Sequence, residues 1–582
     1  MCGIAGVIGE GSARPLIETI THRGPDGVRV EDGEGYSLAH ARLSIIDLEC
    51  GWQPLHAAGC TVIGNGEIYN YLELIEEFGL QEQLTTGSDF EPLLHLYARE
   101  GERAFERLRG MYAFCLIGAD GRTWLVRDPF GIKPLYWRAD EHGVVFGSEP
   151  RALGVKLALK AEQARELLSL NYALESPFEG IQRLAPGEVI EIPTFAHPGD
   201  RLAEARSSQS RDPVLSGQHS AGKSWAPALA GVSGEKGLIQ RLDAVLEDSV
   251  KVHQRSDVPY GLFLSGGIDS AAIATLMARL NARPVTAFTC GFDAPSARDE
   301  RAQAEKVASA LKLDWRETTF TEEDFWRIAP QVAWALDDPT CDYATLPTYK
   351  LAEAAKGTLT VVLTGEGGDE LFGGYGRYRR ALRPRWLGGR AAEPQIDAPF
   401  LKGGGEGVLA RWREAGRGDG TRLQRAQRAD IATWLPNDLL LKLDRCLMAH
   451  GLEGRTPFLD KAVAAFAFDL PDRMKVRGRY GKWLLRKWLE QACPAADPWG
   501  KKKGFTVPVA SWIAPRASDL GPRIVHLKAV REVCDVDAVR AVFADEAQAK
   551  NRWPLLFFGL WSLIHLEGAE PEEALKRLLG EA

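Results

Sequence analysis

Short apolar runs, broken by Gly, Pro, Asn and Asp, recur along the first third of the chain. Their alternation of apolar and polar residues is typical of half-buried β-strands. Residues 90–100 instead repeat apolar residues at helical spacing and predict a helix. This mixture indicates an α+β domain of stacked layers over residues 1–193. The predicted strands are residues 36–47, 61–68, 111–117, 123–127 and 143–148.

A different pattern begins near residue 237, where predicted strands and helices alternate. Such alternation is typical of a parallel sheet with helical crossovers. From about residue 386 the pattern is mostly helical. We therefore predict a second, α/β domain over residues 237–582. Its predicted strands are residues 260–264, 285–290 and 359–364, and its predicted helices are residues 271–280 and 302–311.

Residues 194–236 separate these regions and differ from both. They are rich in Ser, Gly, Ala and Pro with little periodicity, which indicates a linker or a long surface loop. Residues 217–224 (GQHSAGKS) match the GxxxxGK[ST] phosphate-binding pattern, which requires a strand before it and a helix after it. The flanking residues predict neither, and Pro227 opposes a helix. We interpret the match as chance.

The composition restricts the class of protein. Of the 582 residues, 45% are hydrophobic and 26% are charged, the usual proportions of a globular chain. The formal net charge of −8 argues against a broad nucleic-acid-binding face. No apolar stretch reaches the ~18 residues of a transmembrane helix, and no cationic segment precedes the apolar N-terminus as in a secretory signal. We expect a cytoplasmic protein that binds neither membrane nor nucleic acid.

The nine cysteines predict two kinds of role. Cys115, Cys290 and Cys446 lie singly in apolar runs, which indicates small buried side chains of a reducing compartment. The lack of CxxC pairs and Cys/His clusters argues against zinc. Cys2 differs, because removal of Met1 would leave it with a thiol and a free α-amine. The amine, with an ordinary pKa near ~8, can act as the base for the thiol.

The same domain contains polar residues that suit cleavage of a glutamine side-chain amide. The amide of Asn65 and the backbone N–H of Gly66 can form an oxyanion hole. Arg42 can bind a carboxylate through two hydrogen bonds, and Glu67 or Asp89 can bind an α-ammonium group. Taken singly, each residue also fits a turn or a surface ion pair, and Cys2 fits a small apolar residue of the first strand.

Several motifs of the first domain together resemble one known family. They closely resemble the glutaminase domain of glutamine-hydrolysing asparagine synthetases. The resemblance implies the N-terminal-nucleophile (Ntn) hydrolase fold, with αββα layers. The motifs are MCGIAG at the N-terminus, HRGPD at 22–26, RLSIID at 42–47, NGEIYN at 65–70 and RDPFGIKPLYW at 127–137.

This resemblance also implies roles for individual residues. Cys2 would be the nucleophile, and Asn65 and Gly66 would form the oxyanion hole. Glutamine would be held by side chains of the same domain and by the backbone that follows Arg42. The implied glutamine-binding residues are Arg42, Leu43, Ser44, Ile45, Ile46, Asn65, Gly66, Glu67 and Asp89.

Two glycine-rich loops follow predicted strands of the second domain. In SGGIDS (265–270), glycines let the backbone approach phosphate, and Asp269 is placed to hold Mg²⁺. This loop resembles the pyrophosphate-binding loop of ATP pyrophosphatases. The second loop, TGEGGDELFGGY (364–375), resembles a stretch of the synthetase family. There Glu366 would assist the adenylate and ammonia steps, and Asp369 would share the Mg²⁺.

Two later segments extend the resemblance, namely DRCLMAHGLEGRTPFLD (444–460) and KKKGF (501–505). The lysine run matches a segment that contacts pyrophosphate. The implied ATP-binding residues are Leu264, Ser265, Gly266, Gly267, Asp269, Ser270, Cys290, Thr364, Gly365 and Lys502, and the implied metal ligands are Asp269 and Asp369.

The resemblance implies a glutamine-dependent asparagine synthetase. Glutamine would yield glutamate and ammonia, and ATP with Mg²⁺ would activate aspartate as an acyl-adenylate. Ammonia would pass through an internal route and displace AMP. The implied substrates are glutamine, aspartate and ATP, and a homodimer is compatible with the family.

Other functions stay open at this point. Residues 337–349 (DDPTCDYATLPTY) depart from the stretch that many family members carry near the acceptor. The alternative is therefore a related amidotransferase for another carboxylate, such as a sugar acid of a surface polysaccharide. β-Lactam synthetases and lasso-peptide cyclases share the second domain but typically lack the N-terminal cysteine. A non-catalytic binding protein would have lost the catalytic residues, and a glutaminase with an inactive second half would form no AMP.

Overall fold

The computed structural model describes residues 2–192, 206–208, 234–293, 299–403, 406–500 and 507–581. Most of the expected linker 194–236 lies outside these ranges, as does the phosphate-loop-like segment 217–224. Lys502 also lies outside them. The helix α5 (Gly234–His253) begins inside the expected linker, three residues before the predicted boundary at residue 237.

The first part of the chain forms two antiparallel sheets of six strands each. The predicted strands are confirmed, with one correction: the strand predicted for residues 36–47 ends at Arg42. Residues 43–47 form a loop, in which Asp47 adopts the left-handed conformation (φ 53°). The first sheet, in spatial order, is β10 (Gln182–Arg183), β8 (Tyr136–Asp140), β9 (Gly143–Gly147), β1 (Gly3–Gly9), β3 (Tyr36–Arg42) and β2 (Gly27–Gly33). The second is β12 (Arg206–Ser208), β11 (Val189–Ile192), β7 (Thr123–Arg127), β6 (Gly110–Ile117), β5 (Cys60–Ile68) and β4 (Leu55–Ala57).

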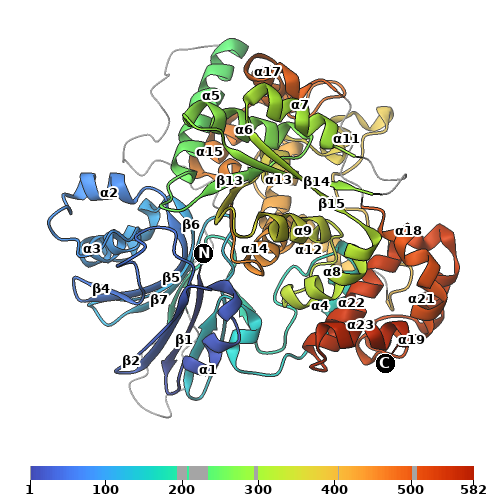
Figure 1. Ribbon diagram of the computed structural model, residues 1–582, viewed down its shortest axis with the longest axis horizontal. Helices are drawn as coiled ribbons and strands as arrows, with labels where there is room; N and C mark the ends of the chain where they lie inside the picture. Colours follow the sequence, from blue (N-terminus) through green and yellow to red (C-terminus); the bar gives the residue numbers. More distant parts are fainter. Residues whose placement is uncertain are drawn as a thin grey trace.

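The alternation along β1 explains how the layers form. Ile4 and Ile8 belong to an apolar core shared with β5 to β7 of the second sheet. Ala5 and Val7 point to the opposite face and pack with α1 (Arg14–Glu18). On the far side of the second sheet, α2 (Tyr71–Phe78) and α3 (Glu91–Glu100) cover another apolar cluster. Helices on both outer faces of two stacked sheets give the expected αββα order (Figure 1).

The second part is built on a five-stranded sheet whose pairings are all parallel. Apolar clusters cover both faces, as parallel sheets require. The prediction of a parallel sheet with helical crossovers is confirmed. In spatial order the strands are β15 (Asp314–Phe320), β14 (Thr286–Phe292), β13 (Tyr260–Phe263), β16 (Val361–Leu363) and β17 (Glu453–Arg455). The main helices around it are α5, α6 (Ile268–Leu280), α7 (Arg301–Leu311), α8 (Glu322–Ala335), α9 (Thr345–Ala355) and α14 (Leu440–Met448).

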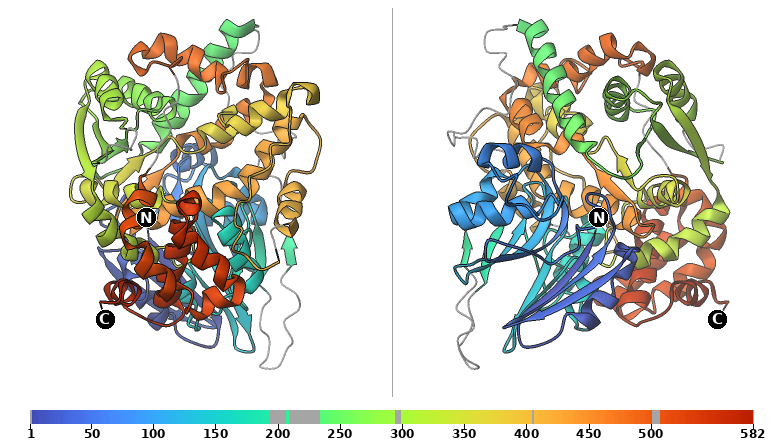
Figure 2. Two further views of the ribbon diagram at one scale, coloured as in Figure 1. Left: turned by 90° about the vertical axis from the view of Figure 1, so that its right-hand side faces the viewer. Right: turned by 60° about the vertical axis from the view of Figure 1, so that its left-hand side comes forward.

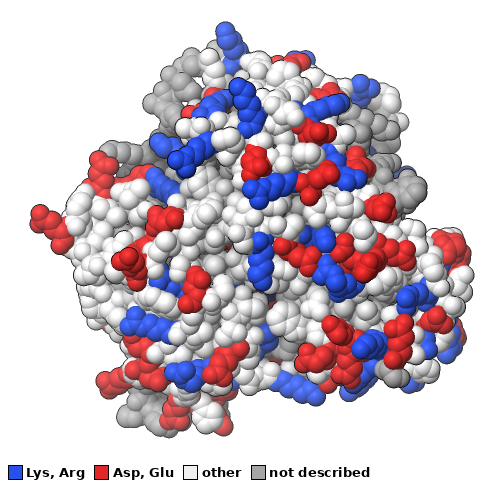
Figure 3. Space-filling view, in the orientation of Figure 1, with Lys and Arg blue, Asp and Glu red and all other residues white. Residues whose placement is uncertain are grey.

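The last part of the chain is helical, as predicted. Its apolar helix α22 (Arg552–His565) packs on α8 and is covered by α23 (Pro571–Leu579). The side views of Figure 2 show these helices beside the N-terminal sandwich, with the parallel-sheet part above both. The face drawn in Figure 3 carries acidic and basic side chains interspersed.

All nine cysteines are free thiols, and Cys115, Cys290 and Cys446 are buried as predicted. In the part of the chain that the structure describes, no cluster of three or more His, Cys, Asp or Glu could hold a metal. Over the same ranges, no helix combines the length and apolar character needed to cross a bilayer.

Candidate functional site

Cys2 lies immediately before β1, against the middle of β5. Its backbone nitrogen donates to Oδ1 of Asn65 at 3.2 Å, and its Sγ lies 3.8 Å from the carbonyl oxygen of Leu43. Burial raises the pKa of the Cys2 thiol. The thiol therefore needs a local base, and in a chain without Met1 the α-amine is attached to the same residue.

Asn65 and Gly66 are adjacent on β5, and the Asn65 side chain keeps a buried N–H donor. Asn65 is fully buried, and among the described residues its side-chain nitrogen has no partner. Because the Asn65 oxygen accepts from Cys2, the amide nitrogen is oriented by a fixed bond. Gly66 has φ 135°, and a Cβ there would lie 2.0 Å from the carbonyl oxygen of Met111. Only glycine fits at this position.

The loop after β3 positions Arg42 next to the cysteine. One guanidinium nitrogen, Nη2, donates to the carbonyl oxygen of Asp47, and the guanidinium stacks over Trp52 at 4.9 Å. The other nitrogen, Nη1, is buried without a partner in the described part of the chain. Asp47 also accepts from the backbone of Gly87. An Arg42 held in this way presents one donor to an anionic ligand such as a carboxylate.

Two buried acids lie beyond the oxyanion donors. Asp89 accepts from the backbone nitrogen of Ile68 at 2.6 Å, and burial raises the pKa of Asp89 to about 7. Burial and the neighbouring Asp89 raise the pKa of Glu67 well above its usual range. Its Oε1 is 3.5 Å from Arg455, and its Oε2 has no partner among the described residues. A bound cation such as an α-ammonium group would stabilise both carboxylates.

Elements of the second half contact the loop after β3 and the residues that follow β5. The backbone nitrogen of Asp257 donates to the carbonyl oxygen of Ile45, and its Oδ2 accepts from the backbone nitrogen of Asp47, both at 2.9 Å. Arg255 donates to the carbonyl oxygen of Tyr69 and forms a two-point ion pair with Glu73. The sequence offered no signal for these contacts.

The two predicted phosphate loops meet at the carboxyl ends of the adjacent strands β13 and β16. A Cβ added to Gly365 would lie 2.9 Å from Asp269 Cβ and from the backbone nitrogen of Ser270, so a side chain at residue 365 would push the loops apart. Within the first loop, the hydroxyls of Ser265 and Ser270 are 2.9 Å apart, and Gly267 donates to Ser265. Ligands of open parallel sheets bind at such strand ends.

The structure brings a residue to this site that the sequence analysis missed. Lys482 is buried before α17 (Trp483–Ala492), and its Nζ bonds to Asp269 and, at 2.6 Å, to Asp369. Both predicted metal ligands therefore converge on one positive charge. Asp269 and Asp369 lie next to a loop of the phosphate-binding type and can share a cation. Carboxylate oxygens are the donors that Mg²⁺ prefers. The only local signal for Lys482 in the sequence is its position between Gly481 and a helix with apolar residues, and this signal is weak.

Glu366 lies near the same carboxylates, and burial raises its pKa. Lys442, itself buried, is among the charges acting on Glu366 and donates to Asp342 at 3.0 Å. Asp342 belongs to the divergent segment 337–349. Asp342 of this segment therefore lies close to the charges that surround Glu366.

The remaining predicted nucleotide contacts lie on the same strand ends. The backbone nitrogen of Leu264 donates to Phe288 on β14, and that of Thr364 donates to Arg455 at 2.9 Å. Cys290 is buried in β14. Of the predicted set, only Lys502 cannot be placed.

Comparisons with known sequences identify the family of this chain. The profile of the asparagine synthase family matches residues 241–565, and that of the glutamine amidotransferase domain matches residues 1–198. The chain belongs to the glutamine-hydrolysing asparagine synthetase family. Similar relatives include asparagine synthetase [glutamine-hydrolyzing] 1 of Bacillus subtilis, 31% identical over 97% of both chains. A putative asparagine synthetase of Mycobacterium tuberculosis is 32% identical over 97% of this chain and 96% of its own. Asparagine synthetase B of Escherichia coli is 30% identical over 88% of this chain and 83% of its own.

The contacts of Lys482 predict how Mg²⁺ should affect the thermal stability of this asparagine synthetase. Replacing Lys482 with Met removes a buried positive charge that bonds to both Asp269 and Asp369. The variant should melt at a lower temperature than the wild type without metal. Millimolar Mg²⁺ alone should raise its Tm by about 2 °C or more, equivalent to about 1 kcal/mol. Wild type should respond less, because Mg²⁺ must first displace the lysine.

Lys487→Met is the matched control, because Lys487 lies on the same helix but pairs with Glu490. Thermal unfolding with and without Mg²⁺ measures all three proteins. An equal response of both variants would contradict a metal site at Asp269 and Asp369.

Proposed function

We propose that this chain is a glutamine-dependent asparagine synthetase with aspartate as its acceptor. The observation that carries the proposal is the coexistence of two complete sets of reactive groups in one chain. Cys2 with Asn65 forms the first set, and the paired loops with Asp269 and Asp369 form the second. We assign residues 1–193 to glutamine hydrolysis and residues 237–582 to amide synthesis.

In the first half, the α-amine of Cys2 takes the thiol proton, and the thiolate attacks the side-chain amide carbon of glutamine. The resulting oxyanion accepts hydrogen bonds from Asn65 Nδ2 and from the backbone of Gly66. Collapse of this intermediate returns the proton to the leaving nitrogen and releases ammonia. Water then cleaves the thioester and yields glutamate. Arg42 would bind the α-carboxylate of glutamine, and Glu67 with Asp89 would bind its α-ammonium.

In the second half, a carboxylate oxygen of aspartate attacks the α-phosphorus of ATP, and pyrophosphate leaves. Mg²⁺ held by Asp269 and Asp369 would neutralise phosphate charge. We propose that Lys482, once displaced from the two carboxylates, binds the departing pyrophosphate. Ammonia then attacks the acyl carbon and AMP leaves. The raised pKa of Glu366 suits it to accept the proton that the attacking nitrogen loses.

The test of this proposal is one reaction with glutamine and Mg-ATP, with and without aspartate. We expect aspartate to bring stoichiometric AMP, pyrophosphate and asparagine, with glutamate from the first half. Cys2→Ala supplied with ammonia should still form asparagine, which controls for the second half. Glutamate without AMP or asparagine would contradict aspartate as acceptor and would direct the search to other carboxylates, including sugar acids.

A second prediction concerns the oxyanion donor. Asn65→Asp keeps the oxygen that accepts from Cys2 but removes the buried N–H donor. Loss of one such donor costs about 3 kcal/mol, so kcat for glutamine hydrolysis should fall by about 10²-fold or more. Ammonia-dependent AMP formation by the same variant serves as the control and should stay within about twofold. A hydrolysis rate close to that of the wild type would exclude Asn65 as an oxyanion donor.

A third prediction follows from the buried acid pair. The α-ammonium of glutamine favours the ionised form of Asp89, whose pKa is raised to about 7. Binding should therefore weaken as the pH falls through 7, by about tenfold between pH 8 and pH 6. The dissociation constant of glutamine on Cys2→Ala measures this without interference from the thiol. Asp89→Asn should bind more weakly at pH 8 with a flatter profile, and a pH-independent constant in the parent would contradict the assignment.

A further inference from the structure

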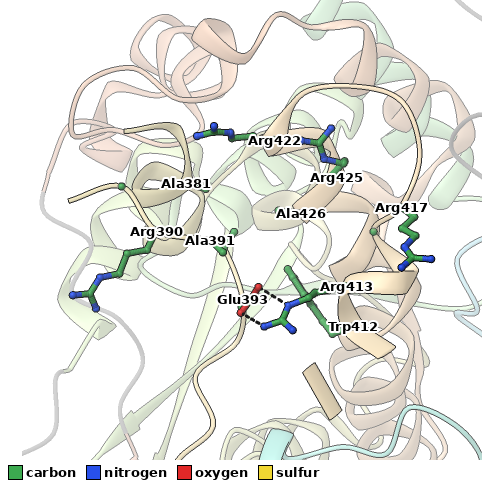
Figure 4. A pocket seen from close by; sticks show the side chains of 13 residues that line it. Ala381, Arg390, Ala391, Glu393, Trp412, Arg413, Arg417, Arg422, Arg425 and Ala426 are labelled. Carbon is green, nitrogen blue, oxygen red and sulfur yellow. Dashed lines mark hydrogen bonds and ion pairs between the residues drawn. The ribbon is translucent and has the colours of Figure 1, made fainter. Parts of the chain in front are cut away.

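A cavity of about 620 Å³ lies outside both proposed reaction sites and shares none of their residues. Its walls come from the end of α11 (Gly376–Leu382), from residues 389–393, from α12 (Glu406–Ala415) and from the start of α13 (Arg422–Ala432). Its volume is in the range of small-molecule pockets. Figure 4 shows the arrangement of its side chains.

The interior of the cavity is apolar and contains one fixed aromatic ring. Trp412 is buried, and its indole Nε1 donates to Oδ1 of Asp430 at 3.2 Å. Asp430 also accepts from Arg377 and from Tyr378. The ring therefore has a defined orientation. The other apolar lining residues are Ala381, Ala391, Ala392 and Ala426.

The charged lining of the cavity is strongly basic, in contrast to the whole chain with its net charge of −8. Its five arginines face a single acid, Glu393, which pairs with Arg413 at 2.7 Å. Arg417 pairs with Glu414 outside the lining. In the part of the chain that the structure describes, Arg422, Arg425 and Arg390 have no carboxylate partner. In Figure 4, Arg422 and Arg425 lie along one side of the cavity and the Arg413–Glu393 pair along the other.

We propose that this cavity binds a small phosphate ester whose apolar or aromatic part packs on Trp412. Guanidinium groups match phosphate oxygens in shape and charge. A phosphate dianion can accept hydrogen bonds from more than one guanidinium group. The alanines and Trp412 supply the surface for the remainder of the ligand. Among the described lining residues, no carboxylate is available for a cationic ligand, because Glu393 is engaged with Arg413.

The cavity is lined in part by α13, and α13 also contacts the segment that carries Asp369. On α13, Gln427 follows the lining residues and donates to the carbonyl oxygens of Glu370 and Leu371 at 2.5 and 2.8 Å. These residues belong to α10 (Gly368–Phe372), which carries Asp369. An occupant of the pocket would therefore sit one helix away from Asp369, separate from the substrates.

The experiment is calorimetric titration of the full chain with phenyl phosphate, and with benzyl alcohol as the uncharged counterpart. We expect phenyl phosphate to bind and benzyl alcohol not to bind. The double variant Arg422→Glu/Arg425→Glu should weaken phenyl phosphate at least tenfold. Arg14→Glu, the same substitution at one exposed arginine of α1, should leave the affinity unchanged. Raising the ionic strength should weaken binding in the wild type.

A further variant separates this pocket from the nucleotide site. Lys482→Ala should retain phenyl phosphate binding, because Lys482 lies outside the cavity. Acidic residues at the start of α13 are compatible with a helix N-terminus. Unchanged ammonia-dependent AMP formation by the double variant would show that its second half folds. Absent binding in the wild type would overturn the proposal. Equal binding by the double variant, or loss of binding only in Lys482→Ala, would overturn it as well.

Discussion

The two halves are joined by a buried network of charges to which both proposed reaction sites are attached. The fully buried Arg23 pairs with Asp444 of the second half at 2.8 Å and donates to the carbonyl oxygen of Cys2 at 3.3 Å. Next to Asp444, Arg445 pairs with Asp337, the first residue of the divergent segment near Glu366. Removing one partner of a buried pair costs about 3–5 kcal/mol, because the other charge stays buried without compensation. A shift between the halves would therefore disturb Cys2 and residues 337–349 together.

The parts of the site that the sequence predicted are those with a local physical cause. Gly365 is needed because the loop after β16 touches the backbone at Ser270, and Gly66 because its φ is positive next to Met111. Such constraints produce glycine-rich motifs that can be recognised in the sequence alone. The parallel sheet was likewise predictable from alternating strands and helices. The strand predicted to continue to residue 47 was wrong beyond Arg42, because an apolar run does not reveal the turn at Asp47.

The contacts that the sequence could not predict join residues far apart in the chain. Lys482 reaches Asp269 across 213 positions, and Asp257 reaches Asp47 across 210. Neither lysine nor aspartate carries a local signature there, since both residue types are ordinarily solvated. The lysine run at residues 501–503 was the more conspicuous candidate by composition. Lys482, a buried lysine outside that run, contacts the two carboxylates, while the run itself lies outside the described residues.

One residue of the sheet edge contacts both halves of the proposed reaction. Arg455 on β17 extends its side chain to Glu67 of β5, while its carbonyl oxygen accepts from the backbone of Thr364, which begins the Glu366 loop. Its other guanidinium nitrogen, Nη1, donates to the carbonyl oxygens of His253 and Arg255. Since Arg455 is fully buried, its guanidinium cannot move without breaking several bonds. A change in the charge of Glu67 when glutamine binds would thus act on a group that is fixed to the strand next to the nucleotide loop. The charge at Glu67 and the position of the loop after β16 therefore both depend on Arg455.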